Sequence, residues 1–511
     1  MSSTTAIQAK HKERRTKGHD LGAEVGPEQD AGSGGRVQIY ERGRIYWHAN
    51  TGAHEVHGGI LAMYLAEGGP GAHPRTGRRH FGYPVSDETK TKEGIHPASF
   101  FEFGDILFVR GTGGVAITGE WRKAWHQQGG MMGKLLLPLS APLSVAGGEA
   151  VYFERGCLWR GPATDGQIIA GRLSPPLLGQ PSLIEPDPSG VRLNALVTWT
   201  LPNPLLASAQ ARRPSLLTDI WRGRLFLKSV EQKGTASHEI GLLPQSSSAN
   251  EFPNQTTVRM HWRIPTNGPV ELAERKLYDL AIRLEGANTV TVAPHSFYVK
   301  SSWGTFGFIH ATDIHVAERI EAMQRRLSSL AAADPTMRNA ANAFVNFNDN
   351  FRDLIRYANH LHDRGMLDLI LATGDVVDYV FEDEDRRERS RGGNFAFFEA
   401  LVRGQVAGAS GRPAEELRVP IFTVFGNHDY RVNPYPLLFD VEIADREVAT
   451  FNAYNLTDSE VRKLQGGKPR LSPEESIAIL QIDQGNGRGD YDYYRRRINA
   501  APSYIVPLGL H

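Results

Sequence analysis

The sequence predicts a multidomain protein: a β-rich repeat module over residues 36–172, an all-β sandwich over 173–300 and an α/β domain over 301–511. Three observations predict this division. A short aromatic and glycine motif recurs in the first part, and apolar and polar residues alternate in the second. In the third part, apolar runs are separated by a helical stretch. Period-two alternation indicates half-buried strands, and short apolar runs separated by helices indicate buried parallel strands.

The first 35 residues are polar and glycine-rich, and this composition predicts a disordered segment over 1–35. A basic stretch from Lys10 to Lys17 is not followed by the apolar segment that a Sec signal peptide requires, which favours a cytoplasmic location. No apolar run approaches the length of about 18 residues that a membrane-spanning helix requires, so none is expected.

The repeat module is indicated by Tyr40–Ile45, which recurs as Phe101–Ile106 and Phe153–Leu158. Such units stack so that each buries a face against its neighbours. Together with Gly52–Gly58 and Phe81–Glu88, the region resembles LGFP repeats, most closely in the first unit and least in the third. The resemblance implies a bacterial protein linked to the cell envelope, with wall glycan as the partner of the repeats. The histidines at 54 and 57 are expected to pack within the repeat.

The middle part alternates apolar and polar residues in three stretches, with these apolar positions: Val191, Leu193, Ala195, Val197 and Trp199; Val258, Met260, Trp262 and Ile264; Tyr278, Leu280, Ile282 and Leu284. Strands of this kind separated by Pro, Gly and Ser predict a small sandwich. No ligand is indicated for it.

The last part places acids, amides and histidines directly after three apolar runs. The runs Phe306–Ile309, Leu369–Ala372 and Val419–Phe425 precede, in turn, Asp313-Ile314-His315, Gly374–Asp378 and Gly426–Asp429. Ligands bind at the carboxyl ends of the strands in open α/β sheets, so the three motifs are expected to meet in one place.

These residue types are typical of a metal site. Carboxylates and amide oxygens suit manganese, magnesium or iron, and imidazole suits iron and zinc. One carboxylate, here Asp375, can bridge two ions. Two ions about 3.5–4 Å apart clamp an in-line displacement at phosphorus and lower the pKa of a shared water.

The order D-x-H, G-D-x-x-D and G-N-H-D resembles the calcineurin-like metallophosphoesterase superfamily. The resemblance implies an α/β sandwich with two divalent ions (Mn, Fe or Zn) and a metal-bridging hydroxide that hydrolyses a phosphate ester. It implies the following roles: Asp313 and His315 ligate one ion, Asp375 bridges, Asn427 ligates the other ion, His428 protonates the leaving group or stabilises charge there, and Asp429 orients His428. For Asp378 we expect a local hydrogen bond rather than ligation.

The chain departs from the family pattern after Asp429. The pattern normally continues with a further histidine and then G-H-x-H, but the only histidine after Asp429 is His511. Residues 503–510 resemble a strand that has just begun. The sequence is therefore expected to be truncated relative to a complete enzyme, and His511 is not favoured as a ligand.

Two features between the motifs complete the α/β domain. Apolar residues at steps of three and four predict a helix with one face on the sheet: Phe344, Phe347, Phe351, Leu354, Ala358 and Leu361. A charge run over 381–391 is expected to be solvated. The alternative is that one of its arginines, Arg386, Arg387, Arg389 or Arg391, holds a substrate phosphate.

Composition limits the partners. Acidic and basic residues balance at 57 each, which argues against a broad electrostatic grip on nucleic acid or an anionic membrane. The hydrophobic fraction of 40% and the charged fraction of 22% are ordinary for a soluble globular protein. The single cysteine, Cys157, permits no intramolecular disulfide and is expected to be a packed thiol.

The sequence thus predicts a metal-dependent hydrolase acting on a phosphate mono- or diester, with no substrate-binding residue assigned. The alternative is a non-catalytic protein of the cell envelope, in which the repeats bind wall glycan and the phosphoesterase domain is an inactive scaffold.

Overall fold

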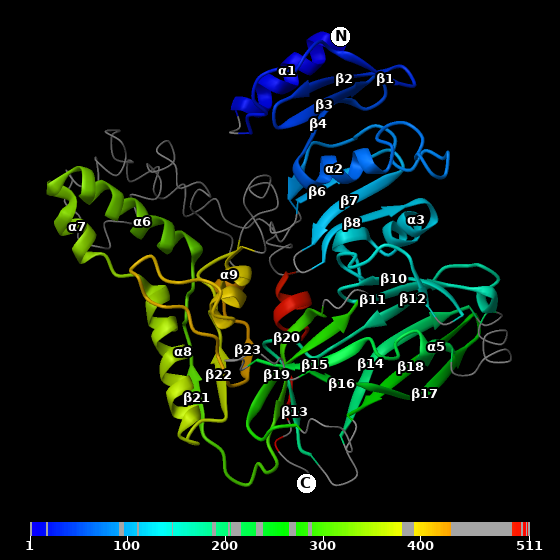
Figure 1. The fold of residues 1–511 in the computed structure, drawn as a ribbon. Helices are drawn as coiled ribbons and strands as arrows, with labels where there is room; N and C mark the ends of the chain where they lie inside the picture. Colours follow the sequence, from blue (N-terminus) through cyan, green and yellow to red (C-terminus); the bar gives the residue numbers. More distant parts are fainter. Residues whose placement is uncertain are drawn as a thin grey trace.

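The computed structural model describes most of the chain, namely residues 3–16, 19–90, 97–109, 112–145, 147–186, 191–202, 205, 216–230, 239–264, 272–284, 289–380, 393–430, 493–501, 504–506 and 508. The four arginines of the charge run and His511 lie outside the described residues. Figure 1 shows two small N-terminal units stacked above the β-sheets of the middle part, with the C-terminal sheet and helices beside them.

Two similar units form the N-terminal part. The first contains the four-stranded sheet β1 (Gln29–Gly32), β2 (Gly35–Tyr40), β3 (Gly43–His48) and β4 (Gly52–His57), followed by α2 (Gly58–Ala66). The second contains β5 (Thr89–Lys90), β6 (Pro97–Phe100), β7 (Gly104–Val109) and β8 (Gly113–Thr118), followed by α3 (Gly119–Gln127) and a 3-10 turn, η1 (Gly130–Met132). Helix α2 also contacts β7 of the second unit, so the units stack as repeats do.

The structure differs from the disorder that the sequence predicts for residues 1–35. Residues 3–16 form helix α1 (Ser3–Thr16), which contacts β3 and β4. Its Ile7 is buried against Tyr40, and its Arg14 pairs with the fully buried carboxylate of Glu55. The polar composition does not predict this helix, because the residues that hold it, Tyr40 and Glu55, lie in the repeat more than 30 residues along the chain.

The third recurrence of the motif does not make a third unit of the same kind. Its strands are β9 (Leu143–Val145), β10 (Gly148–Phe153), β11 (Gly156–Arg160) and β12 (Ile169–Leu173), with a 3-10 turn, η2 (Pro162–Thr164). They continue a seven-stranded sheet with β14 (Arg192–Leu201), β18 (Gln255–Arg263) and β17 (Leu243–Phe252). The strands on both sides of the expected boundary at residue 172 therefore belong to one sheet.

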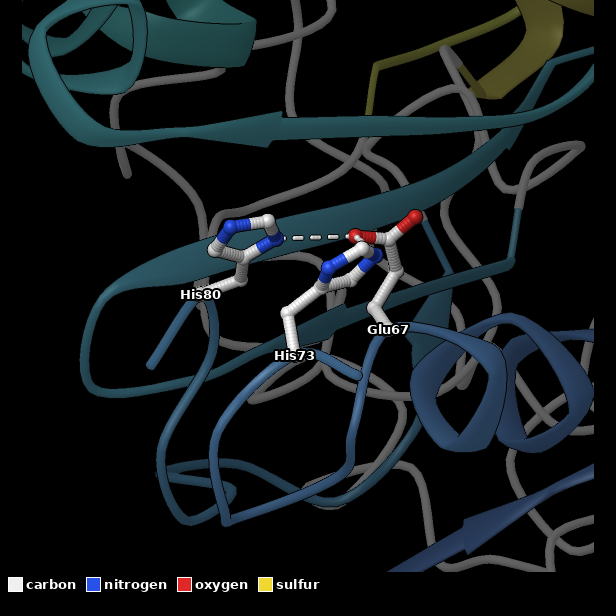
Figure 2. A group of neighbouring side chains, drawn as sticks. All are labelled: Glu67, His73 and His80. Carbon is white, nitrogen blue, oxygen red and sulfur yellow. Dashed lines mark hydrogen bonds and ion pairs between the residues drawn. The ribbon is translucent and has the colours of Figure 1, made fainter. Parts of the chain in front are cut away.

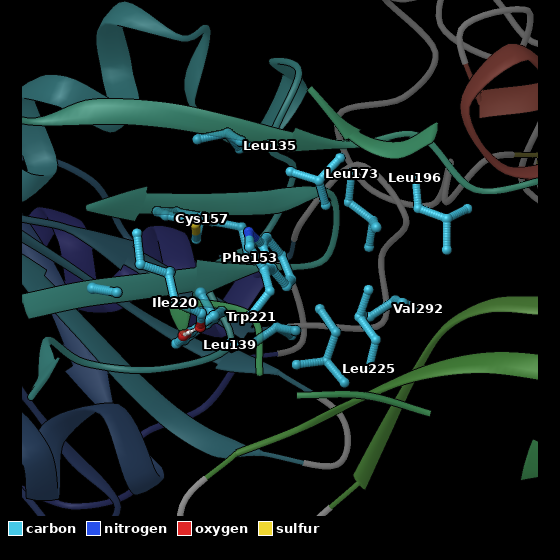
Figure 3. Close-up of a cluster of buried hydrophobic side chains, with 14 of the residues drawn as sticks. Leu135, Leu139, Phe153, Cys157, Leu173, Leu196, Ile220, Trp221, Leu225 and Val292 are labelled. Atoms are coloured by element: carbon cyan, nitrogen blue, oxygen red, sulfur yellow. Dashed lines mark hydrogen bonds between the residues drawn. The ribbon is translucent and has the colours of Figure 1, made fainter. Parts of the chain in front are cut away.

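A five-stranded sheet completes the middle part, in the order β13 (Ser182–Ile184), β20 (Thr289–Val299), β19 (Lys276–Arg283), β15 (Leu225–Ser229) and β16 (Glu239–Gly241), with α5 (Leu216–Asp219) nearby. Figure 3 shows the core that it shares with the seven-stranded sheet, where Phe153 and Cys157 lie near Trp221 and Leu225. Burial raises the pKa of the Cys157 thiol, in keeping with the packed thiol expected from the sequence.

The C-terminal part contains a parallel sheet in the order β21 (Phe308–Ala311), β22 (Leu369–Thr373) and β23 (Ile421–Val424). These strands overlap the three apolar runs. However, β21 begins two residues after Phe306 and is not buried as expected, since Phe308 is 53% exposed. The helices and 3-10 turns are α6 (Glu318–Ala333), η3 (Pro335–Met337), α7 (Arg338–Ala343), α8 (Phe347–Asp363), α9 (Gly393–Val402) and η5 (His428–Tyr430), and a π-helix, η7 (Tyr494–Ile498), follows. Helix α8 is the helix expected from the apolar spacing, and its Phe351, Ile355 and Ala358 join the core on the sheet.

A buried carboxylate of helix α6 links this helix to α8 and to the loop before β23. Glu321 accepts hydrogen bonds from Arg352 Nη1 at 2.7 Å and from the Ala409 amide at 2.8 Å. Burial opposes its ionisation, but the Ala409 amide and the Arg352 guanidinium outweigh that effect and lower the pKa of Glu321. One ionised side chain thus joins α6, α8 and the loop before β23.

The middle and C-terminal parts are also joined. The Gly179 amide donates to the Ile498 carbonyl at 2.7 Å, and the Thr423 amide donates to the Gly179 carbonyl at 2.9 Å. Arg497 pairs with Glu154 at 2.7 Å. The middle part therefore supports β23 and the segment after it. Among the helices of the described residues, none combines the length and apolar character needed to cross a bilayer.

Candidate metal centre

The loops that follow β21 and β22 run side by side, which brings the first two motifs together. The Asp313 amide donates to the Gly374 carbonyl at 3.3 Å, and the His315 amide donates to the Asp375 carbonyl at 2.8 Å. Val316 and Val377 then form a parallel bridge. The pairing of the strands thus continues into the loops and aligns the motif side chains.

Strained backbone is concentrated in these loops. Asp313, His315 and Asp375 have φ values of 54°, 51° and 46°. They are three of the eight non-glycine residues with positive φ in the described part of the chain. Such a conformation costs roughly 1–3 kcal/mol per residue, and it persists where surrounding contacts hold side chains in a functional arrangement.

The three loops deliver imidazoles and carboxylates to one small volume. The Nε2 atom of His315 lies 3.8 Å from Asp313 Oδ1 and 3.8 Å from Asp375 Oδ2. One donor atom from each of His315, Asp375 and His428 lies within 4.8 Å of the others, and the two imidazole rings meet edge to face. A donor set of two imidazoles and one or more carboxylates fits manganese, iron or zinc.

Asp378 fixes both histidines. Its Oδ1 lies 3.4 Å from His315 Nδ1, and its main-chain carbonyl accepts a hydrogen bond from His428 Nδ1 at 2.7 Å. The hydrogen bond to Asp378, helped by the nearby Asp375 and Asp313, raises the pKa of His315. Because a carbonyl only accepts, Nδ1 of His428 carries a proton and Nε2 is left to face the site. Asp378 therefore makes the local contacts expected of it.

Asp429 has partners other than the one implied by the resemblance. Its carboxylate is fully buried and accepts the Val377 amide on Oδ1 and the Gly426 amide on Oδ2, each at 2.9 Å. Burial raises its pKa to about 6. His428 instead donates its Nδ1 hydrogen bond to the main-chain carbonyl of Asp378, because the 3-10 turn η5 points Asp429 inward beneath the loops. Asp429 thus ties the second loop to the third.

Gly426 allows the third loop to approach the second. A Cβ atom at this position would lie 2.2 Å from Asp375 Oδ1 and 2.3 Å from the Asp375 amide nitrogen, closer than real Cβ atoms approach other atoms. The close approach lets the His428 amide donate to Asp375 Oδ1 at 2.8 Å. Asn427, the remaining expected ligand, is exposed on the same loop between Gly426 and His428.

A cavity of 520 Å³ opens beside these side chains, and its polar wall includes Asp313, His315 and Asp378. Its apolar wall comes from α6 and α8 and includes Ile320, Phe347 and Leu354. Sequence patterns alone predict no substrate-binding residue here, because Phe347 falls on the apolar stripe of α8, which indicates a core position. Its side chain is 42% exposed.

Comparison with known families agrees with this architecture. Residues 306–502 match the calcineurin-like phosphoesterase family, whose members act on phosphate esters with metal ions. Residues 21–71 and 81–133 match the LGFP repeat. The chain therefore carries two LGFP repeats followed by a calcineurin-like phosphoesterase domain. The third recurrence, at Phe153–Leu158, lies outside the matched repeats. A comparison with curated protein sequences returned no match.

Proposed function

We propose that this chain hydrolyses a phosphate mono- or diester with the help of two divalent metal ions at the end of the β21–β22–β23 sheet. One observation carries the proposal: three loops, far apart in sequence, place donor atoms of His315, Asp375 and His428 within 4.8 Å of one another. The match of residues 306–502 to a phosphoesterase family supports the reaction class.

The residues present fit the metals that this family uses. In the proposed arrangement Asp313 and His315 would hold one ion, Asn427 would hold the other, and Asp375 would be a ligand of both. Two divalent ions supply Lewis acidity at the phosphoryl oxygens and make a shared water acidic enough to ionise near neutral pH. Asp313, Asp375 and Asp378 each place a carboxylate oxygen within 3.8 Å of a His315 ring nitrogen, and this concentration of negative charge favours cations.

The remaining motif residues are proposed to act on protons and geometry. The hydrogen bond from His428 Nδ1 to the Asp378 carbonyl holds the ring with Nε2 towards the site. We propose that His428, when protonated on both ring nitrogens, delivers the Nε2 proton to the leaving oxygen and returns to the neutral ring, or that its charge stabilises the negative charge there. Asp429 is proposed as a positioning residue, because its two amide hydrogen bonds fix the loops that carry Asp375 and His428.

The domain division is likewise a proposal. We assign the family's α/β sandwich to residues 301–511 and a β-sandwich to the two sheets of the middle part, which share one core. The repeat match ends at residue 133 and β9 begins at Leu143, so we place the boundary between repeat module and middle domain in residues 134–142. This replaces the boundary at residue 172.

The test of the proposed activity is hydrolysis of bis(p-nitrophenyl) phosphate by the full chain with manganese. Asp375→Ala is expected to abolish the metal-dependent rate, because it removes the carboxylate between the two proposed ion positions. Asp363→Ala is the matched control, since Asp363 is an exposed carboxylate at the end of α8 that pairs with Arg418 and lies outside the three motif loops. Equal rates for Asp375→Ala and the wild type would refute the proposal.

A second candidate function is binding of envelope glycan through the repeats. It is favoured by a shallow 640 Å³ groove on the second repeat, where Phe103 is 46% exposed beside Arg122, Lys123 and His126. The guanidinium of Arg79 lies 5.4 Å from the Phe103 ring centroid. A pull-down on purified cell wall separates the candidates, because a purely binding protein is retained without any turnover of the phosphodiester.

The location of the protein follows from the same choice. We propose the cytoplasm for an enzyme acting on a soluble phosphate ester and the cell envelope for the glycan-binding alternative. Fractionation of cells that express the full chain, followed by immunoblotting, distinguishes the two locations.

A further inference from the structure

We propose that a zinc ion binds to Glu67, at the end of helix α2 in the first LGFP repeat, and to His73 and His80, in the segment that joins the two repeats. Figure 2 shows the three side chains converging from the end of α2 and from the loop that follows it. One donor atom from each lies within 4.8 Å of the other two. The group lies in the repeat module, outside residues 306–502, so it is separate from the phosphoesterase centre.

The distances suit a compact ion. The Oε2 atom of Glu67 lies 2.9 Å from His80 Nδ1 and 3.6 Å from His73 Nε2. Donors around a tetrahedral zinc ion are about 3.3 Å apart, given metal–donor distances of about 2.0–2.1 Å. Two imidazoles and one carboxylate are a known zinc ligand set that leaves a fourth position open.

A short hairpin sets the positions of the two histidines. Ala72 and Arg79 form an antiparallel bridge, and the His73 amide donates to the Arg78 carbonyl at 2.8 Å. Gly77, with a φ of 66°, closes the turn. The hairpin thus holds His73 on one arm and His80 at the end of the other, where their rings stack at a centroid separation of 4.5 Å.

His73 is aimed at the proposed ion position. Its side chain is 5% exposed, and its Nδ1 accepts the amides of Arg75 and Thr76, each at 3.2 Å. These contacts leave the ring proton on Nε2, which lies beyond hydrogen-bonding distance of Glu67. When zinc binds at Nε2, it displaces the proton from that nitrogen, and the ring is protonated on Nδ1 instead. Zinc binding therefore breaks the two hydrogen bonds that Nδ1 accepts from the Arg75 and Thr76 amides. The ring stays neutral and no net proton is released from it.

His80 already has the outer contact that metal-binding histidines use. Its Nδ1 faces Glu67, and its Nε2 lies 3.0 Å from the hydroxyl of Thr76. Metal-ligating histidines usually donate their second N–H to a neighbouring acceptor, which fixes the ring and strengthens the ligand. Thr76 can accept that N–H.

The second repeat lacks the group. Fifteen positions separate Gly69 from Pro84 in the segment after α2, but only eight separate the corresponding Gly130 and Pro138 after α3. The extra residues after α2 carry both histidines, and Gln128 follows α3 at the position where Glu67 follows α2. The proposed zinc site therefore belongs to the segment after α2 and is not a general feature of the repeat fold.

The loop that carries the histidines also contacts the second repeat. Arg79 pairs with Glu102 at 3.5 Å, and the Tyr83 amide donates to the same carboxylate at 2.8 Å. A zinc ion that fastens the hairpin to the end of α2 therefore also stiffens the junction between the repeats, next to the groove around Phe103.

The test counts the zinc ions that the full chain binds tightly. Metals are first removed with a chelator, and Zn²⁺ is then titrated into the protein in the presence of a chromophoric competitor. Because zinc is also expected to bind at the proposed phosphoesterase centre, the readout is the difference between variants. Glu67→Gln/His80→Gln is expected to bind one zinc fewer per chain than the wild type, with unchanged manganese-dependent hydrolysis. Thr76→Val is expected to lower the affinity for that zinc ion about 10- to 100-fold.

His126→Gln is the matched control, because His126 pairs with Asp105 in the second repeat at 2.7 Å and, among the described residues, belongs to no cluster of three metal-binding side chains. It is expected to bind as much zinc as the wild type. Equal zinc content and affinity in Glu67→Gln/His80→Gln and the wild type would overturn the proposal. If the double variant fails to fold, as judged by circular dichroism, His80→Gln alone carries the same expectation, since His80 is only partly buried.

Discussion

The substitution Gly426→Ala tests the packing of the three loops most sharply. The added Cβ would lie 2.2 Å from Asp375 Oδ1 and 2.3 Å from the Asp375 amide nitrogen. Real Cβ atoms essentially never come closer than 3.0 Å to another atom, so the two loops must separate by nearly 1 Å. One of the two obstructing atoms is main chain, so a change of rotamer cannot relieve the contact.

A displacement of about 1 Å in a catalytic arrangement can lower the rate about 100-fold. We therefore expect kcat/KM for manganese-dependent hydrolysis of bis(p-nitrophenyl) phosphate to fall about 100-fold in Gly426→Ala. The far-UV circular dichroism should stay unchanged, because the contact is confined to two loops. Gly304→Ala is the control, since the nearest atom to its added Cβ is 3.7 Å away. A rate for Gly426→Ala within threefold of the control would refute the account of the loop packing.

Three further predictions concern stability and reactivity. Arg14→Ala leaves the buried carboxylate of Glu55 without its cation and should destabilise the first repeat by about 3–5 kcal/mol in chemical denaturation. The control Arg15→Ala, at an exposed position, should change the stability little. Equal effects of the two substitutions would mean that α1 does not pack on the repeat. Glu321→Gln should lower the free energy of unfolding at pH 7. The difference from the wild type should shrink as the pH falls below about 4, because the ionised Glu321 carboxylate, whose pKa is lowered in the folded state, stops stabilising the fold once it is protonated. A difference that is independent of pH would contradict this. Native Cys157 should resist a thiol reagent until the chain is denatured, and rapid stoichiometric labelling of the native chain would show that the thiol is accessible.

The strands and motifs of the C-terminal part could be predicted because their signals are local. An apolar run long enough for one buried strand precedes each motif, and parallel strands end at the same edge of a sheet. Strands β21, β22 and β23 form where those runs occur. The residues of one motif follow their strand within a few positions, so their meeting place follows from the topology alone.

The partners of Asp429 could not be predicted in this way. Its direction depends on the turn η5, and its acceptor role depends on where the amides of Val377 and Gly426 lie after the loops have packed. The sequence pattern places Asp429 next to His428, but neighbouring residues in a tight turn point in different directions. The role of Asp378 as the acceptor for His428 depends on the same packing.

Long-range contacts explain the other differences. Helix α1 is polar and is held by Glu55 and Asp87, which are distant in sequence, so its composition resembles that of a disordered segment. The motif at Phe153–Leu158 is a local hairpin signal, but the pairing of β12 with β14 assigns it to the middle sheet. The sequence does not predict the group of Glu67, His73 and His80, because the spacing of these residues matches no regular metal-ligand pattern.

The most direct test of the proposed metal centre is an anomalous diffraction map from crystals of the full chain soaked in manganese chloride. The account predicts anomalous density in contact with both Asp375 and His315, and its loss in Asp375→Ala crystals soaked in the same way. A wild-type map at saturating manganese that shows no density touching these two side chains would contradict the account.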